Sequence, residues 1–139
     1  MFAAPRSSGS TGYGPSAMYR QVGVETGVKT ADPHRLVLML YDGLLEAIAQ
    51  ARGAMRQRQI EAKARAIMRA MGIVEEGLRG ALSPAGGELS RNLGDLYGYV
   101  GMRLMQAHAR NDEEALQECT RLIQPLRDAW VEIGGRLPS

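Results

Sequence analysis

The chain has 139 residues, enough for one domain, and its 45% hydrophobic and 23% charged residues suit a packed soluble fold. A net charge of +2 is too small and too scattered for a nucleic-acid binder, and the single cysteine excludes an internal disulfide and a cysteine-based zinc site. No apolar stretch approaches the roughly 18 residues of a membrane span, and the N-terminus lacks the apolar centre of a secretory signal, so we expect a cytoplasmic protein.

The N-terminal segment 1–29 differs in composition from the rest of the chain. It holds five glycines, two prolines and a Ser/Thr cluster, and it shows little apolar periodicity. Such a segment buries too little surface to offset its chain entropy, so we expect a disordered arm up to about residue 17. Residues 18–29 include the apolar Tyr19, Val22 and Val24 between glycines, which indicates a semi-ordered end of the arm.

The pattern from residue 30 onward is helical. Asp32 followed by Pro33 is typical of a helix start, because the aspartate caps free N–H groups and the proline loses no hydrogen bond there. The first helix is predicted from Pro33 to about Gln57. The second helix is predicted from one apolar stripe with alternating spacings of four and three: Ile60, Ala64, Ile67, Met71, Val74 and Leu78.

Two further helices follow a connection rich in glycine and proline. The third is predicted to end near Arg110 and Asn111, and the fourth opens with acidic residues from Asp112 and ends at Gly134. Their apolar stripes are Leu89, Leu93, Leu96, Val100, Leu104 and Ala107, and then Leu116, Cys119, Ile123, Leu126, Trp130 and Ile133. The predicted fold is all-α: an antiparallel up-down-up-down four-helix bundle over residues 30–139, with a flexible N-terminal arm.

Three local features each have two interpretations. Residues Leu36 to Tyr41 are all apolar and would cover the whole circumference of a helix, so this turn is either deep in the core or forms a groove for a partner. The spaced glycines Gly94, Gly98 and Gly101 indicate either close helix packing or a smooth outer surface. The methionines are either core filler or an adaptable binding surface, and filler is the preferred interpretation.

Residues for catalysis or cofactor binding are largely missing from the sequence. His34 and His108 lack the Glu-x-x-His spacing of di-iron bundles, no phosphate-binding loop is present, and Cys119 is expected to be a buried, inert thiol. We therefore expect no enzyme activity, cofactor or metal. Two alternatives remain: a histidine phosphotransfer bundle using His108 as the phosphoacceptor, and a homodimeric structural bundle.

The stretch TADPHRLVLMLYDG, from Thr30 to Gly43, resembles the signature of the flagellar secretion chaperone family FliS. Further matches extend the resemblance over about residues 18–133: Gly53-Ala54-Met55, Gly87-Glu88, Asn92-Leu93, Leu96-Tyr97, Arg103-Leu104, Asn111-Asp112 and Leu126 to Trp130. The sequence departs from the family pattern at Asp32, where serine is usual, and at Gly98, Gly101 and Pro125.

The resemblance implies a helical bundle that binds the C-terminal segment of newly made flagellin, prevents its premature polymerisation and delivers it to an FlhA-type component of the flagellar export gate. We predict that flagellin contacts the apolar surplus of the first helix and the facing part of the third, while Tyr19, Val22 and Val24 cover or join this groove. The predicted contact residues within the bundle are Leu38, Met39, Tyr41, Leu45, Tyr97 and Gly101.

Overall fold

The computed structural model describes residues 32–134. Four long helices, α2 (Pro33–Arg56), α3 (Ile60–Gly72), α4 (Gly87–Arg110) and α5 (Glu113–Gly134), make up most of this part, which contains no strand. A π-helix, η2 (Ile73–Leu78), continues α3, and a 3₁₀ turn, η3 (Pro84–Gly86), precedes α4. The predicted all-α four-helix bundle is confirmed.

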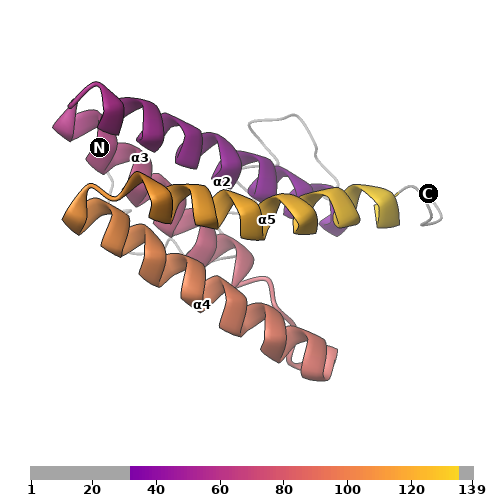
Figure 1. Cartoon of the computed structure of the whole chain (residues 1–139). Coiled ribbons are helices and arrows are strands. Elements are labelled where there is room, and N and C mark those ends of the chain that lie inside the picture. The colour runs from indigo at the N-terminus through magenta and orange to yellow at the C-terminus, as the bar shows by residue number, and fades with distance from the viewer. Residues whose placement is uncertain (1–31, 135–139) are drawn as a thin grey trace, which may run out of the picture.

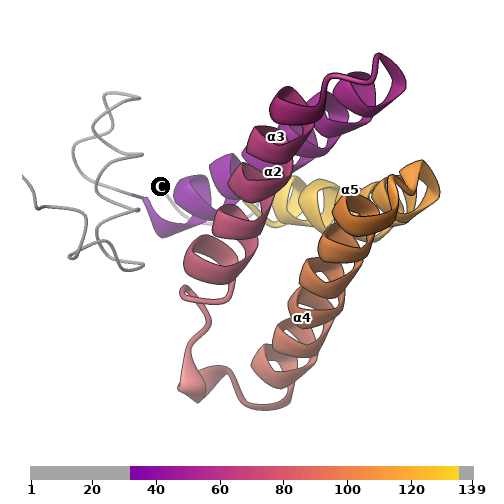
Figure 2. The same ribbon diagram turned by 90° about the vertical axis from the view of Figure 1, so that its left-hand side faces the viewer.

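Short connections join the helices into two hairpins, α2–α3 and α4–α5. In Figure 1 the colour gradient runs from right to left along α2 and α4 and from left to right along α3 and α5. Figure 2 shows the segment through η2 and η3 as the link between the two hairpins. The arm residues 1–29, including Tyr19, Val22 and Val24, lie outside the described residues.

Local hydrogen bonds set the helix ends where the sequence predicts them. The Asp32 carboxylate accepts a hydrogen bond from the His34 backbone N–H at 3.0 Å, and Pro33 occupies the first turn of α2. The Asp112 carboxylate accepts from two backbone N–H groups at the start of α5, at 3.0 and 3.3 Å. Asn111 ends α4 in the left-handed conformation, with φ 51°. Each cap satisfies backbone groups that a helix end leaves without partners.

The core is mainly aliphatic, in keeping with an aromatic content of only 5%. All four helices contribute fully buried side chains, and each large one stabilises the fold by about 1.5–3 kcal/mol relative to exposure. The largest of these side chains are Leu44 and Ile48 of α2, Ile67 of α3, Leu104 of α4, and Leu116 and Ile123 of α5. The predicted stripes therefore face the interior over the middle of each helix.

The sequence analysis assigns three residues to the buried stripes that the structure exposes to solvent. Ile60 is 74% exposed, Leu89 66% and Ile133 45%. Each lies in the first or last turn of its helix, where the apolar period continues but no neighbouring helix covers the side chain. The second stripe also crosses a change of helix type, because the α-helical hydrogen bonding ends at Gly72 and the π-helix follows.

The start of α2 is fastened to the end of α5 by a histidine–tryptophan pair. The rings of His34 and Trp130 stack with their centroids 4.9 Å apart and their planes 7° from parallel. His34 Nε2 lies 2.5 Å from the Trp130 carbonyl oxygen, and Trp130 Nε1 donates to the His34 carbonyl at 2.8 Å. A Cβ on Gly134 would collide with the His34 ring, so this glycine is required for the close approach.

Candidate functional site

The apolar run at the start of α2 is largely used by the bundle itself. Leu36, Leu40 and Tyr41 are buried, with 5%, 3% and 3% of their surface exposed. The other three residues of the run, which include Leu38 and Met39, are half-buried. Leu38 and Met39 are also absent from the side chains that pack against the core cluster, so they retain accessible apolar surface on α2.

Tyr41 meets Tyr97 inside the bundle. Their hydroxyl groups are 2.6 Å apart, and both side chains are buried, so the pair joins α2 to α4 through the interior. Burial raises the pKa of the Tyr41 hydroxyl, while the hydrogen bond with Tyr97 works in the opposite direction. The structure thus brings together two of the predicted contact residues, as internal partners of each other.

The remaining predicted residues occupy different surroundings. Leu45 is half-buried and packs against the core cluster. Gly101 is buried on α4, where an added Cβ would lie 3.0 Å from Glu75 Oε2 of η2. Tyr41, Tyr97 and Gly101 are buried in this structure, so contact of a client with them would require a rearrangement of the groups that cover them. For the whole predicted set, contact with flagellin stays a prediction.

Close packing, rather than an open surface, accounts for the three spaced glycines of α4. An added Cβ would lie 3.4 Å from Leu82 Cδ1 at Gly94 and 3.3 Å from Arg79 Nη1 at Gly98. Gly94, Gly98 and Gly101 therefore form the side of α4 that faces η2 and the turn after it. The internal interpretation of the glycine spacing holds.

The structure exposes three methionines that the sequence analysis preferred as core filler. Met68 of α3 is 61% exposed, and Met102 and Met105 of α4 are 47% and 48% exposed. We call these three residues the methionine patch. The filler interpretation is confirmed for Met55 and Met71, which pack against the core, and it is wrong for the patch. The high methionine content was the available signal, but helix periodicity alone does not separate the two groups.

Two contacts mark the stretch over which α3 and α4, the helices of the methionine patch, run side by side. Lys63 Nζ donates to the His108 carbonyl oxygen at 3.1 Å, and Glu75 lies against Gly101. Between these two points α3 and α4 run side by side, and all three methionines lie within that stretch of their helices. The neighbouring α4–α5 contact has a polar edge, where Arg103 Nε donates to Glu118 at 2.6 Å.

Charged contacts at that polar edge are well satisfied. The Tyr99 hydroxyl donates to Glu118 Oε2 at 2.7 Å, beside the Arg103 contact. These two hydrogen bonds lower the pKa of the Glu118 carboxyl, and the bond from Tyr99 has the larger effect. Arg103, which takes part in this network, lies between Met102 and Met105 of the patch in the sequence.

The structure shows the surroundings of Cys119, His108 and the side chains that could bind a metal. Cys119 is fully buried, its thiol approaches the Val100 carbonyl oxygen at 3.8 Å, and burial raises its pKa to about 12, as expected for an inert thiol. His108 is half-buried, and its Nδ1 atom is buried without a hydrogen-bond partner among residues 32–134, so its use as a phosphoacceptor stays a prediction. Among residues 32–134 no cluster of three or more histidine, cysteine or acidic side chains is arranged to hold a metal ion.

No helix within residues 32–134 combines the length and the apolar character that a membrane span requires.

Comparison with known proteins gives consistent matches over most of the chain. The family model of the flagellar protein FliS matches residues 15–136. The flagellar secretion chaperone FliS of Salmonella typhimurium is 40% identical over 116 residues, which cover 83% of this chain and 86% of that protein. FliSB of Pseudomonas aeruginosa, also a flagellar secretion chaperone, is 46% identical over 113 residues, or 81% of this chain and 89% of that protein. FliS of Bacillus subtilis is 36% identical over 118 residues, or 85% and 84%.

Proposed function

Because the chain belongs to the FliS family of flagellar secretion chaperones, we propose that it binds the C-terminal segment of flagellin in the cytoplasm and prevents its premature polymerisation. The complex then delivers flagellin to an FlhA-type component of the flagellar export gate. A chaperone family implies a non-enzymatic role. The structural observation that supports the proposal is accessible apolar surface on a well-packed bundle: Leu38 and Met39 on α2, and the methionine patch on α3 and α4.

The chemistry of these residues suits a helix-prone, apolar client. Methionine side chains are flexible and polarizable, so they adapt to side chains of different shape. A client that folds on binding buries on the order of 1,000–3,000 Å², but its ordering offsets part of the interaction energy. Net affinity is then moderate for the buried area, which suits a carrier that must release its cargo at the export gate.

The proposed client surface has an accessible part and a closed part. Leu38, Met39 and the methionine patch are reachable in this structure, whereas Tyr41 and Tyr97 are closed by their mutual hydrogen bond. We place the first client contacts on the accessible part. Without a client, the same apolar surface could pair two copies of the chain, and sedimentation of the client-free protein would detect that homodimer.

Acidic substitutions test the accessible surface. Leu38→Asp and Met105→Asp place a charge where an apolar contact is proposed, so each should weaken binding of a flagellin C-terminal fragment about tenfold or more. Isothermal calorimetry measures the affinity, and circular dichroism checks that the helices remain. Leu89→Asp is the matched control, because Leu89 is an exposed leucine outside the proposed surface. Equal affinities for all three variants and the unmodified protein would contradict the proposed surface.

Deleting residues 1–29 tests the predicted role of the arm. If the arm covers the client surface, the shortened protein should have a lower melting temperature and a higher affinity for the flagellin fragment. If the arm joins the contact, the affinity should fall. Both quantities unchanged would leave the arm without a role in client binding.

A further inference from the structure

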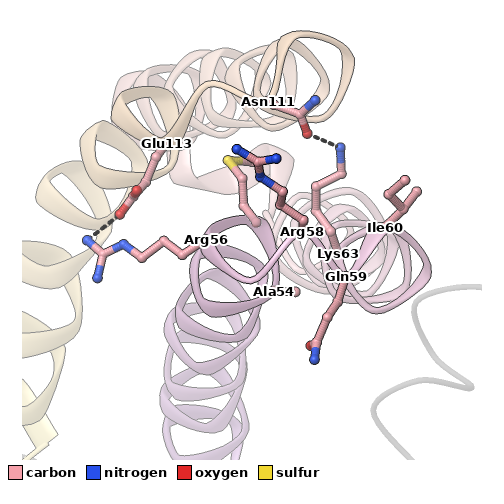
Figure 3. Close-up of a pocket in the computed structure, with 9 residues that line it drawn as sticks. Ala54, Arg56, Arg58, Gln59, Ile60, Lys63, Asn111 and Glu113 are labelled. Atoms are coloured by element: carbon pink, nitrogen blue, oxygen red, sulfur yellow. Dashed lines mark hydrogen bonds and ion pairs between the residues drawn. The ribbon is translucent and has the colours of Figure 1, made fainter.

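A pocket of about 450 Å³ opens at the end of the bundle where α2 turns into α3 and α4 turns into α5 (Figure 3). Its apolar lining comes from Ala54, Met55 and Ile60, and its remaining lining is polar or charged. The pocket lies at the opposite end of α2 from Pro33, about 36 Å away at 1.5 Å per residue. It is therefore separate from the accessible surface on the first turns of α2.

Lys63 contributes a buried positive charge to this pocket. Only 6% of the residue is exposed, and Nζ donates to the His108 carbonyl oxygen at 3.1 Å and to Asn111 Oδ1 at 2.5 Å. Both acceptors are neutral, and no carboxylate of the described chain pairs with the ammonium group. The C-terminal dipole of α4 offsets part of the burial cost, but the site still lacks the counter-charge that a buried lysine normally has.

Arg58 contributes a second positive charge and an unusual backbone. Its φ is 58°, the left-handed region that favours glycine or asparagine, and its guanidinium has no hydrogen-bond or ion-pair partner within residues 32–134. In Figure 3 this guanidinium lies between the Arg56–Glu113 pair and the Lys63–Asn111 pair. Arg58 thus brings to the pocket a guanidinium that has no partner among the described residues. Its backbone has a conformation that glycine would adopt more easily.

The single acid of the pocket is already engaged. Glu113 pairs with Arg56 at 2.5 Å and with Arg52 at 3.2 Å, and the hydrogen bond from Arg56 is the largest cause of its lowered pKa. Arg56, Arg58 and Lys63 stand against this one carboxylate, so 3 − 1 leaves two positive charges in the lining. Charge complementarity therefore favours an anionic ligand.

The shape of the site favours an extended ligand over a small ion. A second hollow of about 390 Å³ adjoins the pocket and shares Ala54 and Gln59 with it. Its lining repeats the combination of small apolar residues and arginine, with Ala62, Ala66, Arg65 and Arg69, of which Arg69 pairs with Glu46. Glu61, an acid in the first turn of α3, lines neither hollow.

We propose that this end of the bundle docks an extended acidic peptide segment of a partner protein, at the opposite end of α2 from Leu38 and Met39. A carboxylate of that segment binds between Arg58 and Lys63, and an apolar side chain next to it packs on Ala54, Met55 and Ile60. Charge-assisted hydrogen bonds to the carboxylate supply the specificity, and the apolar floor distinguishes a peptide from a free ion.

The test is a titration of the full, ¹⁵N-labelled chain followed by NMR at low ionic strength, where charge pairing is least screened. The probe is the peptide acetyl-Asp-Leu-Glu-Ala-Asp-Leu-amide, and its neutral match carries Asn and Gln in place of Asp and Glu. The acidic peptide should give saturable shifts of the amides around Arg58, Lys63 and Asn111. The neutral peptide should bind about tenfold more weakly, because it lacks the charge-assisted bonds.

Arg58→Gly is the decisive variant, since glycine adopts the same backbone conformation without strain and the substitution removes the side chain together with its guanidinium. Its melting temperature should be unchanged or higher, and its affinity for the acidic peptide about tenfold lower. Arg91→Gln, which removes an exposed arginine of α4 remote from the pocket, should bind like the unmodified chain.

Three results would overturn the proposal: no saturable shifts, equal binding of the two peptides, or full affinity in Arg58→Gly. Inorganic phosphate that shifts the same amides as strongly as the acidic peptide would identify a small-anion site and would also contradict it. If Arg58→Gly lowers the melting temperature, Arg58→Asn provides the same test with a residue that tolerates positive φ.

Discussion

Tyr41 and Tyr97 show how the interior determines the role of single residues. From the sequence they belong to the apolar surface offered to a client, yet their hydroxyls lie 2.6 Å apart in the buried core. A buried hydroxyl needs a hydrogen-bond partner, and each tyrosine supplies one for the other. Their pairing links α2 to α4 across the interior of the bundle.

A double-mutant cycle measures this coupling. Tyr41→Phe and Tyr97→Phe should each lower the free energy of unfolding by about 1–2 kcal/mol, because each leaves the other hydroxyl without this bond. The double variant should lose less than the sum of the two. Urea unfolding followed by circular dichroism gives the values. Tyr99→Phe, which removes a hydroxyl from an exposed side chain, should have a smaller effect. Strict additivity of the two buried substitutions would show that the hydroxyls do not support each other.

Glycines distinguish the helices at the scale of elements. An added Cβ on Gly53 of α2 would meet no atom of residues 32–134 within 4 Å, whereas Gly101 in α4 faces Glu75 of η2. The η2 π-helix faces Gly101, and the residues that follow it, Arg79 and Leu82, face Gly98 and Gly94. Those glycines therefore let two elements approach each other, whereas Gly53 only weakens its helix.

Replacing each glycine by alanine separates these two roles. Gly53→Ala should raise the free energy of unfolding by about 0.5–1 kcal/mol, the usual gain of alanine over glycine inside a helix. Gly101→Ala should gain less or destabilise, because its Cβ would come within 3.0 Å of the Glu75 carboxylate. Thermal unfolding of both variants provides the comparison. The same gain at both positions would show that η2 moves aside without cost.

Ion pairs link the helices at the scale of the whole molecule. Glu113 at the start of α5 pairs with Arg52 and Arg56 of α2, and Arg127 near the end of α5 pairs with Asp42 at 2.8 Å. Together with the His34–Trp130 contact, these interactions connect α2 and α5 along their length. All of these ion pairs depend on ionised carboxylates, so we expect the stability of the bundle to fall in acid.

The acid response can be assigned to Glu113 by Glu113→Gln. The lowered pKa of this carboxyl means that it stabilises the fold fully above its ordinary value of 4.5 and that this contribution is lost as the pH falls through the lowered pKa. The variant should melt below the unmodified protein at pH 7, and the difference should shrink on acidification past that range. Melting temperatures from pH 7 to strong acid test this. A constant difference would contradict the assignment, and Glu88→Gln, at an exposed residue of α4, is the control.

The sequence by itself determined the helices, their caps and the family. Asp32, Asn111 and Asp112 act through hydrogen bonds within a few residues, and apolar periods identify the buried face of each helix, so these features need no knowledge of the partner helices. The family signature is likewise a pattern of residues along the chain.

The tertiary structure alone decided which apolar residues stay accessible and where the basic pocket forms. Tyr41 is buried because Tyr97 of a helix 56 residues away in sequence reaches it, while Met68 and Met105 have the same apolar character but no helix above them. Arg58 and Asn111 line one pocket because two separate turns meet at the same end of the bundle. Such accessibility depends on the relative rotation and register of packed helices, which periodicity within one helix does not specify.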